Sequence, residues 1–336
     1  MSIPVRVVLA GLLLGAGLTA CGDQGAGAAD GEVVVGRLSD EATGDSTYVL
    51  LPTGRIDLTV GEPVDEVTAD QAGDDEKHAA PDGGSFVPVT WEHDPFGEGA
   101  VPVGVMGADP QEADVVLVSG GTKADLGAPY QLAGDQGTTD TGVGTMYVAV
   151  DGDGESPTFE VTYDGLTQTV DPASGDRDAG AAAALYAEPT MGVEAPCTSE
   201  GFASGPVRPD VSCLVNAPQR TPYLPGQGWA EDGHTWLLVN ADISLSGVTV
   251  ARTSYDVASV APHLTVNGGE PLPADGRYGS AQPEPTAVRD TWAFDGSADG
   301  ANTLEVALDL VLELDSGPGP TTRRVTVQQS VALGAG

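Results

Sequence analysis

The chain is poor in positive charge. It holds only two lysines, Lys77 and Lys123, and its 13 basic residues face 50 acidic ones, for a formal net charge of -37 at pH 7. Binding to nucleic acid or to anionic headgroups requires clustered Lys and Arg, so we predict no nucleic-acid partner. The acidic residues are spread along the chain, which favours a role in solubility; a calcium-binding or salt-adapted surface is the alternative.

The motifs of common catalytic sites are missing as well. There is no Gly-x-Ser-x-Gly elbow, no His-Glu-x-x-His and no phosphate-binding loop that ends in Gly-Lys-Ser or Gly-Lys-Thr. Gly142-Val143-Gly144 lacks the third glycine of a dinucleotide fingerprint. We therefore predict that the chain is not an enzyme and has no cofactor. A catalytic constellation assembled from distant loops is the alternative that this sequence leaves open.

Sustained helical periodicity is scarce too. A parallel α/β enzyme needs helices of about 10–15 residues between its strands, and the sequence provides none. The 47 glycines and 25 prolines exceed average usage without reaching the level of a disordered chain. Short strands joined by many turns explain this composition, so the sequence predicts an all-β fold. A single helical turn is expected at 181–186.

Two Asp/Gly-rich turns invite a calcium interpretation. Asp151-Gly152-Asp153-Gly154-Glu155-Ser156 has oxygen ligands at alternate positions, as a hard cation prefers. However, Ser156 and Thr162 stand where an EF-hand loop needs glycine and a bidentate acid. The turn at 295–300 is similar. Both are typical of plain β-turns, so we predict no metal, with calcium as the alternative.

Alternation of apolar residues predicts the strands. In the first half they are expected at 33–35, 48–51, 56–60, 86–91, 115–118 and 146–150. Pro88 favours an edge position for the strand at 86–91, because proline cannot donate to a ladder. The strongest local signal is Asp164-Gly165, a two-residue hairpin turn. It places Tyr163 opposite Leu166 and Phe159 opposite Val170.

The second half contains two longer candidates. Residues 235–243 alternate, with apolar side chains on one side. Residues 304–314 fit either a strand or a helix, because apolar residues occupy every second position while Glu305, Asp309 and Glu313 lie four apart. We predict a strand, since three like charges at that spacing repel one another on a helix. A returning strand is expected from Arg324, after a turn at 316–320.

The N-terminus carries the clearest functional signal. The apolar run from Val5 to Ala20 is shorter than the roughly 20 residues of a transmembrane helix but suits a secretory signal. It ends in Leu18-Thr19-Ala20-Cys21, which resembles the lipobox of bacterial lipoprotein signal peptides. The resemblance implies cleavage after Ala20 and a diacylglyceryl group on the Cys21 thiol, and two acyl chains anchor a protein stably. An ordinary signal peptide that contains a cysteine is the alternative.

Cysteine usage fits this interpretation. If Cys21 carries lipid, Cys197 and Cys213 remain. An oxidising compartment favours their pairing as a disulfide. A zinc site is the alternative, but it needs four ligands at close spacing, and His234 and His263 are distant in sequence.

These features divide the chain into four parts. Residues 1–20 are the signal peptide, 21–31 a flexible tether, 32–186 a first β-sandwich domain and 187–336 a second. Each predicted domain has a tryptophan strand (Trp91 or Trp236) after a Gly-rich turn and closes with a hairpin. This order resembles the immunoglobulin-like domains of unknown function in envelope lipoproteins of Gram-positive bacteria. The resemblance implies tandem antiparallel sandwiches, no catalytic residues, and core positions for both tryptophans.

The loop-like segment 223–230 contains two aromatic residues among glycine and proline. Tyr223 and Trp229 are candidates for a binding surface, since aromatic residues anchor interfaces; alternatively they plug the end of a sandwich. We expect a lipid-anchored protein on the extracytoplasmic face of the cell membrane, with a non-catalytic binding or scaffolding role toward an envelope protein or the cell wall. The alternatives are a helix-rich solute-binding component of a transporter and an accessory envelope hydrolase with a carboxylate-lined cleft.

Overall fold

Strands make up nearly all the regular structure among the residues that the structure describes. The computed structural model describes residues 27–37, 41–95, 101, 103–106, 112–127, 145–187, 194–231, 233–272, 284–296 and 302–333. Helix is limited, within these ranges, to α1 (Val103–Met106) and the 3-10 helix η1 (Gly180–Tyr186), which confirms the turn expected at 181–186. The predicted all-β fold is confirmed.

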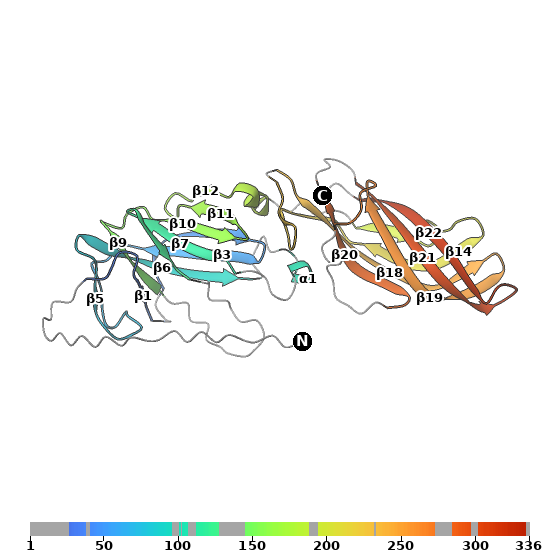
Figure 1. Ribbon diagram of the computed structural model, residues 1–336, viewed down its shortest axis with the longest axis horizontal. Coiled ribbons are helices and arrows are strands. Elements are labelled where there is room, and N and C mark those ends of the chain that lie inside the picture. Colours follow the sequence, from blue (N-terminus) through green and yellow to red (C-terminus); the bar gives the residue numbers. More distant parts are fainter. Residues whose placement is uncertain are drawn as a thin grey trace, which may run out of the picture.

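Two five-stranded antiparallel sheets form the N-terminal half, residues 32–186 (Figure 1). The first sheet has the order β1 (Val33–Val35), β9 (Thr145–Asp151), β6 (Gly84–Asp94), β3 (Gly54–Gly61), β2 (Gly44–Leu51). The second has the order β12 (Arg177–Asp178), β11 (Leu166–Val170), β10 (Thr158–Tyr163), β7 (Asp114–Ser119), β8 (Thr122–Asp125). A small hairpin, β4 (Glu66–Val67) with β5 (His78–Ala79), lies outside both sheets.

The core of this half lies between the two sheets. Leu58 and Trp91 from the first sheet and Leu117 and Phe159 from the second belong to one cluster of buried apolar side chains. Alternate residues of a strand point to the same face, so each strand contributes every second side chain to this cluster. Trp91 is 4% exposed, which confirms its predicted place in the core.

The hairpin of β10 and β11 has the predicted register. Tyr163 pairs with Leu166 and Phe159 with Val170. Asp164 and Gly165 both have positive φ, 44° and 78°, as a primed two-residue turn requires. This turn is central to the contact between the two halves of the chain.

The predicted edge position of the strand that contains Pro88 is wrong. Its strand, β6, is not at an edge but lies in the middle of the first sheet, between β9 and β3. The ladder with β3 stops at the pair Val60–Val89, and the next backbone contact on that side is the bridge between Val64 and Phe86. Pro88 lies in the gap between these two contacts. It is tolerated there because the neighbouring backbone requires no donor at that point.

Side chains from the second sheet and η1 bond three backbone groups of the edge strand β2, at Tyr48 and Leu50. Gln168, which is 1% exposed, donates from Nε2 to the Leu50 carbonyl at 2.8 Å. The Tyr186 hydroxyl accepts from the Leu50 amide and donates to Gln168 Oε1, each at 2.8 Å. Arg177 donates to the Tyr48 carbonyl at 2.7 Å. Unpaired strand edges attract other chains, so these bonds protect this edge as well as joining the two sheets.

The outer face of the first sheet is covered by the segment that contains β4 and β5. Val67, Ala72 and Phe86 form a separate buried cluster there. The chain preceding β1 joins this cover, because the Ala28 amide donates to the Ala79 carbonyl and the Gly31 amide to the Ala149 carbonyl, each at 2.8 Å. Residues 28–31 are therefore bonded to the N-terminal half, and the predicted tether of 21–31 is too long at this end.

One eight-stranded antiparallel sheet forms the C-terminal half, residues 187–336. Its main order is β13 (Ala195–Thr198), β14 (Val207–Val215), β18 (Trp236–Val250), β19 (Thr253–Val266), β21 (Asn302–Ser316), β22 (Thr322–Leu333). Two further strands, β15 (Gln219–Thr221) and β20 (Ala287–Asp295), also pair with β18.

This sheet folds over on itself. The long strands β18 and β19 pair only through Val248–Val250 and Thr253–Tyr255, whereas β19 pairs with β21 along nearly its full length. Side chains from β14, β18 and β20 share one buried cluster with those from β19, β21 and β22. The half is thus a two-layered β-structure whose layers are continuous at the β18–β19 corner.

The strand expected at 304–314 is confirmed as part of β21. Leu304 and Leu308 are fully buried. Glu305, Asp309 and Glu313 lie on the opposite, exposed side of the same strand. The Thr326 hydroxyl donates to Asp309 Oδ1 at 2.5 Å, across the ladder to β22. In the strand the acids share a solvated face. Asp309 Oδ2 also lies 3.4 Å from His263 Nε2, and Glu305 accepts a hydrogen bond from the Ser330 hydroxyl.

Candidate functional site

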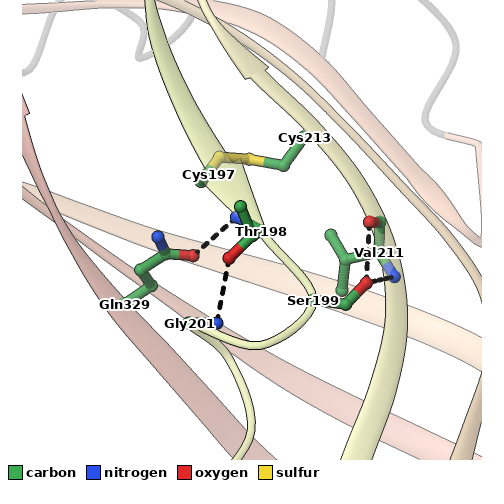
Figure 2. The surroundings of a disulfide bond; sticks show 7 residues. All are labelled: Cys197, Thr198, Ser199, Gly201, Val211, Cys213 and Gln329. Atoms are coloured by element: carbon green, nitrogen blue, oxygen red, sulfur yellow. Dashed lines mark hydrogen bonds between the residues drawn. A yellow bond between two sulfur atoms is a disulfide. The ribbon is translucent and has the colours of Figure 1, made fainter.

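The three cysteines have separate places. Cys21, the predicted lipidation site, lies outside the described residues. Cys197 and Cys213 form a disulfide, with their Cα atoms 5.2 Å apart, as predicted from the cysteine count (Figure 2). They are directly opposed on the adjacent strands β13 and β14. The disulfide of an immunoglobulin domain joins the two sheets, so this bond differs from that pattern.

Hydrogen bonds brace the segment that the disulfide closes. Figure 2 shows Ser199 Oγ between the amide and carbonyl of Val211, at 2.9 and 3.0 Å. The Thr198 amide donates to Gln329 Oε1 of β22 at 3.0 Å, which connects β13 to the far edge of the folded sheet. The disulfide region therefore has a structural role in holding β13 in place.

The candidate binding residues Tyr223 and Trp229 are brought together by a small hairpin. They face each other across β16 (Tyr223–Leu224) and β17 (Gly228–Trp229), with ring centroids 5.2 Å apart. Both rings contact Tyr163 of the N-terminal half edge to face, at centroid distances of 5.4 Å for Tyr223 and 6.3 Å for Trp229. Tyr163, Asp164, Tyr223 and Trp229 are called the aromatic cluster below.

Polar bonds fix the geometry of the aromatic cluster. The Tyr223 hydroxyl donates to Asp164 Oδ2 and the Trp229 indole N–H to the Tyr163 carbonyl, each at 2.9 Å. Burial raises the pKa of the Tyr223 phenol well above its usual value, and its bond to Asp164 acts in the same direction. Burial also raises the pKa of Tyr163. Both phenols are therefore neutral at physiological pH, and Tyr223 remains a donor.

An apolar patch lies next to the aromatic cluster. Val101 and the α1 residue Val105, 4% and 3% exposed, pack with Leu224, Leu238 and Ala293 of the C-terminal half. In Figure 1 α1 lies between the two halves. These residues are called the apolar patch, and with the aromatic cluster they form the interface between the halves.

Trp236 also lies beside the apolar patch. Its side chain is partly buried against the patch, and its indole N–H donates to the Gly228 carbonyl at 3.1 Å. The predicted core position is thus wrong for Trp236, because its side of β18 faces the N-terminal half rather than the layer formed by β19 and β21.

Sequence reasoning identified one side of this interface. Tyr223 and Trp229 stood out as aromatics in a Gly/Pro-rich loop, but Tyr163 and Asp164 were recognised only as part of a hairpin. The sequence did contain a signal for the other side. Tyr163 directly precedes the Asp164-Gly165 turn, and at such a turn the Tyr163 carbonyl and the Asp164 carboxylate are available to accept hydrogen bonds. Tyr223 is 3% exposed, so an outside partner must displace the N-terminal half to reach it. Binding of a partner by this pair stays a prediction.

The acidic turn after β9 is held by the protein itself. The Glu155 amide donates to Asp153 Oδ1 at 3.2 Å, and Ser85 donates to the Gly152 carbonyl at 3.1 Å. Throughout the described residues no three His, Cys, Asp or Glu side chains are grouped closely enough to hold a metal ion. The turn at 295–300 falls largely outside those residues.

Comparison of the chain with family models, curated proteins and solved structures found no match. Over the ranges that the structure describes, no helix is long and apolar enough to cross a bilayer.

Proposed function

We propose that this protein is a lipoprotein anchored through Cys21 to the extracytoplasmic face of the cell membrane, where it binds or scaffolds an envelope protein or the cell wall without catalysis. The observation that carries the proposal is the cysteine arrangement. Cys197 and Cys213 are joined to each other, so Cys21 is the one cysteine left for a lipid. It directly follows Leu18-Thr19-Ala20, the residues that resemble a lipobox.

The disulfide supports an oxidising compartment independently of the signal sequence. Disulfides persist outside the cytosol and are rare within it. The acidic surface is compatible with that location, because it disfavours adsorption to anionic headgroups. The lipid rather than the protein surface would then provide membrane attachment.

The β-rich architecture favours this proposal over a solute-binding transporter component. That alternative predicts a helix-rich protein, and the described residues contain one four-residue α-helix and one 3-10 helix. The aromatic residues that were the best candidates for a contact surface hold the two halves together. A partner that binds Tyr223 and Trp229 therefore has to separate the two halves first.

Lipid attachment is tested by metabolic labelling of bacterial cells with an alkyne fatty acid. Wild-type protein should take up the label and remain in the membrane fraction, and Cys21→Ser should do neither. The matched control is the double variant Cys197→Ser/Cys213→Ser, which removes two thiols but keeps Cys21 and should still be labelled. A free thiol at Cys21, detected by mass spectrometry of the native membrane fraction, contradicts the anchor.

The binding role is tested by crosslinking in intact cells. We expect the anchored protein to capture an envelope protein or cell-wall fragment that Cys21→Ser, released from the membrane, captures less. Turnover of envelope material by the purified protein would instead support the hydrolase alternative.

A further inference from the structure

The two ends of the N-terminal half have different attachments. At one end the Ala28 amide, near the start of the described residues, donates to the Ala79 carbonyl of β5. Figure 1 shows β5 at the end of the long axis that is remote from the C-terminal half. At the other end the turn at Tyr163 and Asp164 contacts Tyr223 and Trp229.

The contact between the halves restricts their relative motion in two ways. Two hydrogen bonds of 2.9 Å fix the orientation of the Tyr223 and Trp229 rings relative to the turn at Tyr163 and Asp164. The apolar patch adds buried contacts beside it, through Val101 and Val105 on one half and Leu238 and Ala293 on the other. A bending motion at this interface has to break the hydrogen bonds and expose apolar surface at the same time, which opposes hinge motion.

The C-terminal half also extends away from this interface. Its strand β18 begins at Trp236, beside the apolar patch, and runs to Val250; fifteen residues of strand span about 45 Å. The turn after β21 lies at the far end of that strand, because Thr253 donates to the Pro318 carbonyl. The far tip of the molecule is thus at the turn that includes Asp315 to Pro318.

We infer that the aromatic cluster and the apolar patch lock the two halves into one rigid spacer that holds the C-terminal half away from the membrane. This rests on the proposed anchor at Cys21. Six residues lie between Cys21 and Ala28, so a fully extended chain separates the two Cα atoms by at most about 25 Å. The β5 end therefore stays close to the bilayer, and the length of the N-terminal half separates the C-terminal half from the lipid.

Rigidity is tested in solution, without any membrane. Spin labels are attached through encoded ketone residues at the exposed positions Asp82, near β5, and Asp315, at the far tip, and the distance between them is measured by pulsed electron resonance. Wild-type protein should give one narrow distance peak. Tyr223→Ala/Trp229→Ala should lose that peak and give a broad distribution. A broad distribution in the wild type overturns the proposal.

A matched pair of variants separates the interface from general destabilisation. Tyr223→Phe removes the hydroxyl that bonds Asp164 and should broaden the peak. Tyr48→Phe removes a hydroxyl from a ring that contacts Tyr186, Arg55 and Arg177 rather than the aromatic cluster, and should leave the peak unchanged. Circular dichroism establishes that each variant keeps its β spectrum. An unchanged peak in Tyr223→Ala/Trp229→Ala, with the fold intact, refutes the role of the aromatic cluster.

Orientation is tested on vesicles with the chain that starts at Cys21, coupled through that thiol to a maleimide lipid. Fluorophores at Asp82 and Asp315 are compared for energy transfer to an acceptor in the headgroups. We expect strong transfer from position 82 and loss of transfer from 315; equal transfer refutes the spacer. Because the lipid is attached chemically, this result is independent of whether cells lipidate Cys21, which the labelling experiment decides.

Discussion

Replacing Gln168 by leucine should destabilise the N-terminal half strongly, although the two side chains are similar in size. Gln168 is 1% exposed and joins edge strand β2 to β11. Its Nε2 donates to the Leu50 carbonyl, and its Oε1 accepts from the Tyr186 hydroxyl, which in turn accepts from the Leu50 amide. The leucine variant loses two hydrogen bonds and leaves the buried Leu50 carbonyl without its side-chain partner.

The magnitude follows from these groups. A buried carbonyl that loses its partner costs roughly 1–3 kcal/mol, and a neutral hydrogen bond contributes roughly 0.5–1.5 kcal/mol net. Tyr186 is only partly buried, so its hydroxyl can turn to water and recover part of the loss. We expect the free energy of unfolding to fall by about 2–4 kcal/mol in Gln168→Leu. Tyr186→Phe should cost less, and the double variant should cost less than the sum, because both changes remove the same bond.

The assay is urea denaturation at constant pH, followed by circular dichroism and tyrosine fluorescence. Gln328→Leu is the matched control, since Gln328 is exposed in the middle of strand β22 and should change stability by less than about 0.5 kcal/mol. A loss in Gln168→Leu no larger than in this control, or full additivity in the double variant, would refute the reasoning.

Three further predictions concern other parts of the chain. Burial lowers the pKa of His93, so the unfolded chain binds that proton more readily; stability should be complete above the unfolded pKa of about 6.5 and fall as pH decreases below it. A His93→Gln variant should show a flatter urea midpoint between about pH 7.5 and 5, and an equally steep profile would exclude His93 as the cause. Reducing Cys197–Cys213 should lower the free energy of unfolding of the C-terminal half by roughly 3 kcal/mol, which denaturation with and without reductant measures; an unchanged midpoint would contradict it. Leu308→Ala should cost about 2–5 kcal/mol because Leu308 is fully buried between the layers, and thermal unfolding that matches the wild type would exclude this.

The local elements were accessible from the sequence because their signals are local. Asp164-Gly165 allows positive φ at two consecutive residues, and that fixes the register of a hairpin. Alternation from Leu304 to Leu314 together with the repulsion among three acids predicts a strand, as the structure has it. The pairing of Cys197 with Cys213 followed from counting cysteines rather than from any knowledge of the sheet.

Longer-range features were not accessible. The sequence predicts an edge position for Pro88 because strand propensity describes the proline itself and not the strands beside it. The gap in the β3–β6 ladder that accommodates Pro88 is produced by residues 61–64. The end of the tether was drawn at residue 31 because Gly and Ala favour flexibility, while backbone bonds to Ala79 and Ala149 hold residues 28–31 in place.

The sequence by itself determined the strand content, the hairpin turn, the disulfide pair and the expectation of an anchor at Cys21, because each depends on residues that are adjacent or few in number. Only the tertiary structure decided that the Trp236 side chain packs at the interface with the N-terminal half, and what Tyr223 and Trp229 contact. An aromatic ring in a loop carries the same pattern whether it meets a partner or its own chain. The difference arises from where the Tyr163–Asp164 turn lies in space, about sixty residues earlier in the chain, and no local rule connects the two.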